Sequence, residues 1–220
     1  MNVKICGLKR LEDIEYVNES KPDWIGFVFA GSKRKIDVET AMQLKKELDK
    51  EIKAVGVFVN EKIEFILKLV EDEVIDFIQL HGDEEETYIQ DLQERLMKKQ
   101  KNIPIIKAIR VKSTKQILEA QKLTVNYLLL DTFSGKEYGG SGEVFNHNLI
   151  PKLEKPYILA GGIDLENVNN ILELLSKQGK TPICIDVSSS VETNGYKDRE
   201  KIDKLVKKVH CFEKCDKIEM

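Results

Sequence analysis

The sequence predicts an α/β fold: a single (β/α)8 barrel of the TIM type, with parallel strands. Eight short segments rich in β-forming residues recur from end to end of the 220 residues. Several of them, such as VGVFV, YLLL and ICIDV, are almost entirely apolar, which is typical of strands covered on both faces of a parallel sheet. Segments with helical periodicity separate them, so each strand is expected to be followed by a helix.

The predicted strands leave room for one helix after each of them. They are residues 2–5, 24–29, 54–59, 75–80, 103–109, 127–130, 157–159 and 183–187. Apolar side chains repeat at helical spacing in the sets Ile63, Ile66, Leu67, Val70; Ile89, Leu92, Leu96; Val168, Ile171, Leu172, Leu175; and Ile202, Leu205, Val206, Val209. Asp83, Ser113 and Asp164 are predicted helix N-caps. A right-handed succession of β/α units closes into a barrel, and an open doubly wound sheet is the alternative.

The chain is predicted to form one domain, because no segment rich in proline, glycine or serine divides it. The barrel is assigned to residues 1–210. Residues 211–220 form a polar tail beyond the last residue of the helical stripe, and this tail is expected to fray.

Composition and charge exclude several classes of partner. The 35 basic and 38 acidic residues are interspersed and the formal net charge is −3, so no contiguous basic face for nucleic acid is expected. No run approaches the roughly 18 apolar residues of a membrane span, and residues 1–10 lack the apolar region of a signal peptide. The protein is therefore expected in the cytoplasm, without a membrane partner. Four scattered cysteines do not form a disulfide framework.

The active site of such a barrel lies at the C-terminal ends of the strands, where the first strand reaches Cys6. Lys4 shares its face, about 6 to 7 Å away by the strand rise, and a nearby ammonium favours the thiolate. Cys6 is therefore a candidate catalytic base. Two alternatives stay open: Cys6 is a small buried apolar residue, or Asp186 of the eighth strand neutralises Lys4 and leaves Cys6 unaffected.

Asp131 follows the apolar YLLL run at the end of the sixth strand. A lone aspartate at a strand end commonly caps the following loop. In a ring of eight strands, however, the first and sixth are well separated, so Cys6 and Asp131 would face each other across the mouth with a small substrate between them. An acid–base pair needs this arrangement.

Two loops favour a phosphorylated small molecule as ligand. Gly161 and Gly162 follow the seventh strand, and Ser188, Ser189 and Ser190 follow the eighth. Loops at these positions commonly bind phosphate through backbone N–H groups. Ordinary turn chemistry explains either loop alone, but the two together indicate a phosphate site.

Other residues at the predicted strand ends suit binding. Arg34, in a charged run after the second strand, is predicted to bind a substrate carboxylate bidentately. His81, at the end of the fourth strand, is predicted to be hydrogen-bonded instead of acting as a base, and is counted among the substrate-binding residues. The glycine-rich loop 138–142 is predicted to be a mobile cover. His81, His147 and His210 have no metal-ligand spacing, so no metal site is predicted.

Seven motifs at these strand ends occur in a fixed order. They are KICG (4–7), FVF…SKR (27–34), QLHG (79–82), LLLD (128–131), GGSG (139–142), LAGGI (159–163) and DVSSSVE (186–192). Together, over about residues 2–200, they resemble the phosphoribosylanthranilate isomerase family. The resemblance implies an Amadori rearrangement in tryptophan biosynthesis, which converts N-(5-phosphoribosyl)anthranilate into the corresponding 1-deoxyribulose phosphate without a metal or coenzyme.

The resemblance also implies residue roles. By position in the motifs, Asp131 would protonate the furanose oxygen as general acid, and Cys6 would remove the C2′ proton as general base. Arg34 would hold the anthranilate carboxylate, while the glycine and serine loops would hold the phosphate.

The sequence departs from the family pattern at three places. Ser190 replaces the glycine usual in DVSSGVE, and would strain the site if that glycine had a positive φ. Lys9 replaces the threonine usual after KICG-L, and Asn146-His147 replaces the more usual Asp-Trp. None of these is the proposed acid or base, so activity is expected to survive.

Two other functions stay open. Another sugar-phosphate barrel, such as a pentose-phosphate epimerase or the tryptophan synthase α-subunit, would share the phosphate loops, although an epimerase requires paired aspartates and often a metal. A non-catalytic barrel that binds a phosphorylated metabolite is the second. Such a protein has no use for an opposed Cys6 and Asp131.

Overall fold

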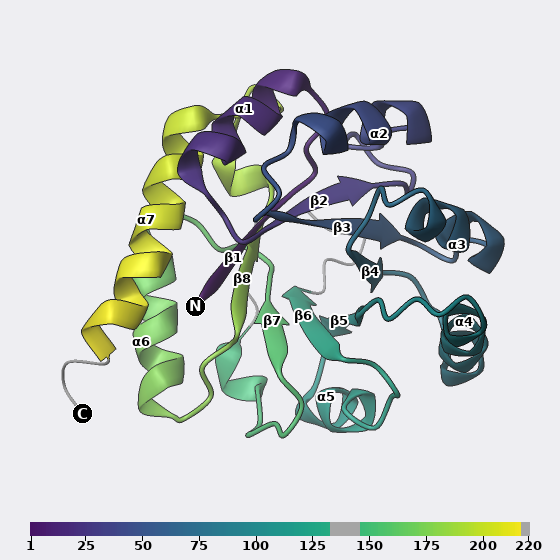
Figure 1. Ribbon diagram of the computed structural model, residues 1–220. Helices are drawn as coiled ribbons and strands as arrows, with labels where there is room; N and C mark the ends of the chain where they lie inside the picture. Colours follow the sequence, from purple (N-terminus) through teal and green to yellow (C-terminus); the bar gives the residue numbers. More distant parts are fainter. Residues whose placement is uncertain (133–145, 217–220) are drawn as a thin grey trace.

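The computed structural model is a closed barrel of eight parallel strands surrounded by helices (Figure 1). The structure describes residues 1–132 and 146–216. The strands are β1 (Asn2–Cys6), β2 (Trp24–Val28), β3 (Lys53–Phe58), β4 (Phe77–Leu80), β5 (Ile105–Val111), β6 (Tyr127–Thr132), β7 (Tyr157–Leu159) and β8 (Cys184–Val187). Because β8 pairs with β1 through Val3 with Ile185 and Lys4 with Asp186, the barrel prediction is confirmed and the open sheet is excluded.

The helices cover the outside of the ring (Figure 1). They are α1 (Leu11–Ser20), α2 (Val38–Glu47), α3 (Ile63–Glu71), α4 (Glu86–Lys98), α5 (Thr114–Ala120), α6 (Val168–Lys177) and α7 (Arg199–Asp216), with the short 3-10 helices η1 (His147–Leu149) and η2 (Ser189–Val191). Between β6 and β7 the described residues contain η1 and no α-helix. A hairpin of β9 (Glu192–Thr193) and β10 (Tyr196–Lys197) follows η2. No helix in the described ranges has the length and apolar character to cross a membrane.

The predicted helix starts are partly wrong. Ser113 caps α5 as predicted, since its hydroxyl accepts a backbone N–H of that helix at 3.3 Å. However, α4 begins after Glu85 instead of Asp83, and α6 begins after Asn167 instead of Asp164. Asp164 accepts the backbone N–H of Asn167 at 2.9 Å, so it caps the turn that precedes α6.

The predicted boundary at residue 210 falls inside α7, which continues to Asp216. Two contacts hold its later turns against the barrel. His210 Nε2 lies 3.0 Å from Asp23 Oδ2, and Phe212 packs against the main core cluster. Residues 211–216 therefore continue the helix.

The core has two layers. The first fills the barrel and consists of Trp24, Val55, Ile106, Ala108, Leu129, Ile158, Ala160 and Cys184. Phe77 and Tyr127 pack against this layer. The centroid of the Trp24 ring lies 4.8 Å from that of Phe77 and 6.1 Å from that of Tyr127. The larger layer lies between the strands and the helices. Because side chains alternate along a strand, Gln79 and Asp131 share the interior face with Phe77 and Leu129. The barrel interior is therefore polar at the C-terminal ends of the strands and apolar below them.

A buried ion pair anchors the loop after β4. Lys107 of β5 donates to Glu84 Oε2 at 2.7 Å and to the Gly82 carbonyl at 2.8 Å, and the two charged side chains are 6% and 1% exposed. Glu84 also accepts the backbone N–H groups of Asn60 at 2.7 Å and Gly82 at 3.0 Å. Since buried charges require such partners, this network fixes the chain beside His81.

Replacing Lys107 by methionine should lower the free energy of unfolding by about 3–5 kcal/mol, because it leaves a buried carboxylate without its counter-ion. Urea unfolding measures the change. Lys68→Met is the control, since it removes an exposed partner of Asp72 and should leave the midpoint close to that of the unmodified protein. Equal midpoints for the two variants would contradict the prediction.

Candidate active site

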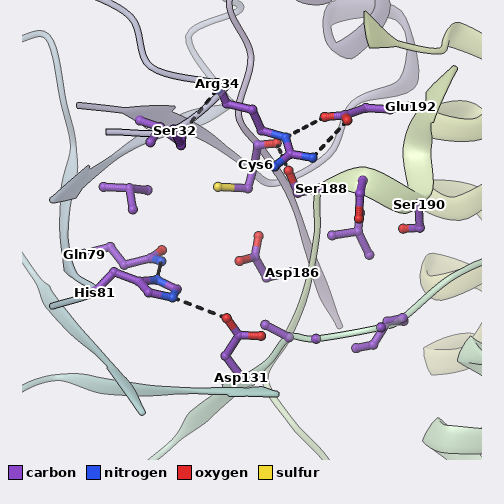
Figure 2. Close-up of a pocket in the computed structure, with 18 of the residues that line it drawn as sticks. Cys6, Ser32, Arg34, Gln79, His81, Asp131, Asp186, Ser188, Ser190 and Glu192 are labelled. Carbon is purple, nitrogen blue, oxygen red and sulfur yellow. Dashed lines mark hydrogen bonds and ion pairs between the residues drawn. The ribbon is translucent and has the colours of Figure 1, made fainter. Parts of the chain in front are cut away.

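A cavity of about 630 Å³ opens at the C-terminal ends of the barrel strands. All the residues predicted for the site line it: Cys6, Arg34, His81, Asp131, Gly161, Gly162, Ser188, Ser189 and Ser190. Figure 2 shows Cys6 and Asp131 entering from different walls, with Asp186 between them in this view. The structure therefore brings the predicted thiol and carboxyl into one cavity.

Gly26 of β2 leaves the space that Cys6 occupies. The two residues are register partners on β1 and β2, and a Cβ atom at Gly26 would lie 2.7 Å from Cys6 Sγ. That separation is an overlap in a close-packed interior. A glycine inside the apolar segment WIGFV is a signal of close approach that could have identified this position from the sequence.

Lys4 is neutralised by Asp186, which was the alternative considered from the sequence. The Lys4 ammonium is fully buried and donates to Asp186 Oδ1 at 3.0 Å. Burial raises the pKa of the Cys6 thiol above its ordinary value, and the positive charges of Lys4 and Lys197 offset this only in part. The prediction that Lys4 favours the thiolate is correct in sign, but burial of the thiol outweighs it.

His81 connects Gln79 to Asp131 (Figure 2). Gln79 Nε2 lies 2.8 Å from His81 Nδ1, and His81 Nε2 lies 3.3 Å from Asp131 Oδ2. His81 is thus hydrogen-bonded as predicted. Asp131 Oδ1 accepts the N–H of Thr132 at 2.8 Å, so a hydrogen bond orients this carboxyl oxygen.

Arg34 is held by Glu192, a contact that the sequence did not indicate. Arg34 Nε and Nη2 donate to the two Glu192 oxygens at 2.7 and 2.9 Å. Although burial opposes it, the hydrogen bond from Arg34 and the charge of Lys197 lower the pKa of Glu192 to about 2. A guanidinium has five N–H donors, so Arg34 keeps Nη1 and one Nη2 proton that this pair does not use.

The glycine and serine loops border the cavity as expected. Gly161 and Gly162 have positive φ values of 85° and 66°, and a Cβ at Gly161 would lie 2.8 Å from Asp131 Oδ1. Glycine is therefore required where the loop after β7 passes the carboxyl. Ser190 lies in η2 and its φ is not positive, so the backbone strain considered for this position does not arise.

Several residues of the site were not predicted. Glu192 and Lys197 come from the hairpin, and Lys201 of α7 reaches the cavity while donating to the Glu192 carbonyl at 2.8 Å. No sequence motif distinguishes these lysines from others in a chain this rich in them. The predicted cover loop 138–142 lies outside the described residues. In the described ranges, no three His, Cys, Asp or Glu side chains are grouped to hold a metal ion.

Comparison with known proteins identifies the family. The family model of N-(5′-phosphoribosyl)anthranilate (PRA) isomerase matches residues 3–208. N-(5′-phosphoribosyl)anthranilate isomerase of Endomicrobium trichonymphae is 47% identical over 205 residues, which cover 93% of this chain and 96% of that protein. The enzyme of Thermoanaerobacter pseudethanolicus is 46% identical over 211 residues, covering 95% and 98%.

Solved structures give the same result. The phosphoribosyl anthranilate isomerase of Thermus thermophilus superposes with a TM-score of 0.80 at 30% identity, covering 96% of this chain and 100% of that chain. A phosphoribosyl anthranilate isomerase in complex with reduced 1-(o-carboxyphenylamino)-1-deoxyribulose 5-phosphate gives 0.73 at 33% identity, covering 94% and 97%. The chain therefore belongs to the N-(5′-phosphoribosyl)anthranilate isomerase family.

Proposed function

We propose that this chain converts N-(5-phosphoribosyl)anthranilate to 1-(2-carboxyphenylamino)-1-deoxy-D-ribulose 5-phosphate by an Amadori rearrangement, a step of tryptophan biosynthesis. The observation that carries the proposal is that the thiol of Cys6 and the carboxyl of Asp131 reach one cavity from β1 and β6. Family membership supports the substrate class. The proposed compartment is the cytoplasm, where the thiol stays reduced, and neither nucleic acid nor a membrane takes part.

The reaction requires one acid and one base. Asp131 gives a proton to the furanose oxygen; the C1′–O bond breaks, and the nitrogen lone pair forms a C1′=N Schiff base. The Cys6 thiolate then removes the C2′ proton, and the C–H electrons form the enolamine. Loss of the C2′ hydroxyl proton and protonation at C1′ give the ketone. His81 Nε2 lies 3.3 Å from Oδ2 of the carboxylate that Asp131 becomes.

Substrate binding follows from the charges around the cavity. The donors of Arg34 that Glu192 does not use suit the anthranilate carboxylate. Backbone N–H groups of the Gly161–Gly162 and Ser188–Ser190 loops suit the phosphate, and Lys201 adds a cation on that side. No metal or coenzyme is invoked for any of these steps.

Cys6→Ser and Asp131→Asn should each lower kcat by about 10²- to 10⁴-fold, the usual contribution of a general acid or base. Turnover is followed by the loss of fluorescence of freshly made substrate, without added metal. Cys211→Ser, at an exposed cysteine, and Asp72→Asn, outside the cavity, are matched controls that should retain activity. A folded but inactive parent protein would overturn the isomerase proposal and favour a binding-only barrel.

The dependence of kcat/KM on pH should follow the thiol once the acid no longer titrates, as in Asp131→Asn. Because a base acts only when deprotonated and burial raises the pKa of Cys6, the residual kcat/KM of this variant should rise from about pH 6 to about pH 9, close to tenfold per unit where the thiolate is scarce. The residual activity of Cys6→Ser should lack this limb. A flat profile in Asp131→Asn over that range would argue against Cys6 as the base.

Gly26→Ala should lower kcat/KM by about 100-fold, because its methyl group would displace Cys6 Sγ and small misplacements of a reacting group have effects of that size. Gly56→Ala is the matched control. Its Cβ would meet Phe58 at 2.8 Å, away from the cavity, so it should reduce stability while the folded fraction keeps its kcat/KM. Equal losses of kcat/KM in the two variants would rule out a specific effect on Cys6.

A further inference from the structure

The hairpin after β8 carries a buried lysine to the Cys6 wall of the cavity. Lys197 of β10 is 5% exposed, and its ammonium donates to the Ser188 carbonyl at 2.9 Å and to Glu192 Oε1 at 2.8 Å. The Ser188 hydroxyl in turn donates to the Cys6 carbonyl at 2.9 Å. Lys197 is therefore connected to the β1 strand end through a single serine.

The other charges near Cys6 are balanced. On β1 and β8, Lys4 and Asp186 form a buried pair with no net charge. On the opposite wall, His81 of the β4 end faces Asp131 of β6. Neither pair supplies a net positive charge on the side of the thiol.

The hairpin side is not balanced. Glu192 binds Arg34 through both of its oxygens, and Lys197 through only one. Arg34 and Lys197 thus share one anion, and Lys201, which donates to the Glu192 carbonyl, adds a third cation, so the net charge of these four residues is +2. Lys197 is the buried one of the three cations, and its charge is shielded from solvent.

We propose that Lys197 is a positioning residue for Cys6: it holds the chain after β8 against the β1 end and supplies the positive charge that stabilises the thiolate. The catalytic consequence rests on the proposed function. The titration behaviour agrees, since the charge of Lys197 acts against burial to lower the pKa of Cys6. Burial lowers the pKa of Lys197, while Glu192 and a Cys6 thiolate act to raise it.

The test is the rate of iodoacetamide alkylation at Cys6 against pH, read by mass spectrometry of the peptide that contains Cys6. Lys197→Gln keeps a donor but removes the charge, and should lower the rate at pH 7 about tenfold by moving the midpoint up about one unit. Lys197→Arg should restore the midpoint. Lys204→Gln, at an exposed lysine of α7 that pairs with Glu200, should leave the midpoint unchanged.

The same variants separate positioning from general damage to the fold. In the Asp131→Asn background, where the acid no longer titrates, Lys197→Gln should move the rising limb of the kcat/KM profile together with the thiol midpoint, while KM changes little. An unchanged midpoint in folded Lys197→Gln would overturn the proposal. Lys197→Met replaces it if the glutamine variant does not fold, and unfolding of both would assign Lys197 to stability alone and overturn the proposal too. Absence of turnover in the unmodified protein would refute the isomerase function but leave the thiol titration readable.

Discussion

The ion pair between Lys4 and Asp186 connects the first and last strands inside the barrel. The two residues are register partners across β1 and β8 and lie 3.0 Å apart, nitrogen to oxygen. Two charges removed from water are tolerated only together, so the pair disfavours any other register at the closure of the ring. That register brings Ser188 to the Cys6 carbonyl and sets the geometry of this wall.

Because Lys4 and Asp186 neutralise each other, the positive charge that stabilises a Cys6 thiolate must come from other residues. A neutral pair offers little net field, so Lys4 alone does not compensate for the burial of Cys6. Lys197 of the hairpin adds to the partial offset of this burial, while on the opposite wall His81 Nε2 lies 3.3 Å from Asp131 Oδ2. One wall thus supplies positive charge to the thiol and the other orients a carboxyl, which is the separation of environments that an acid and a base require.

The strands and the candidate pair were predictable because each depends on local sequence. A strand buried on both faces is apolar along its own length, and barrel topology converts strand order into position around the mouth, so Cys6 and Asp131 follow. The contact between Arg34 and Glu192 spans 158 positions, and the hairpin strands are too short to show alternation. The effect of burial on Cys6 depends on how much water the closed ring excludes, which no local pattern records.

Ser190 shows how a departure from a family motif is absorbed. Its backbone in η2 has no positive φ, so a side chain is accepted without conformational strain and the glycine usual here is not required for that reason. The serine hydroxyl is buried and has no hydrogen-bond partner among the described residues. The cost of the substitution is therefore the desolvation of one hydroxyl, about 1–3 kcal/mol. That cost falls on stability and leaves the backbone N–H groups of the loop in place for a phosphate.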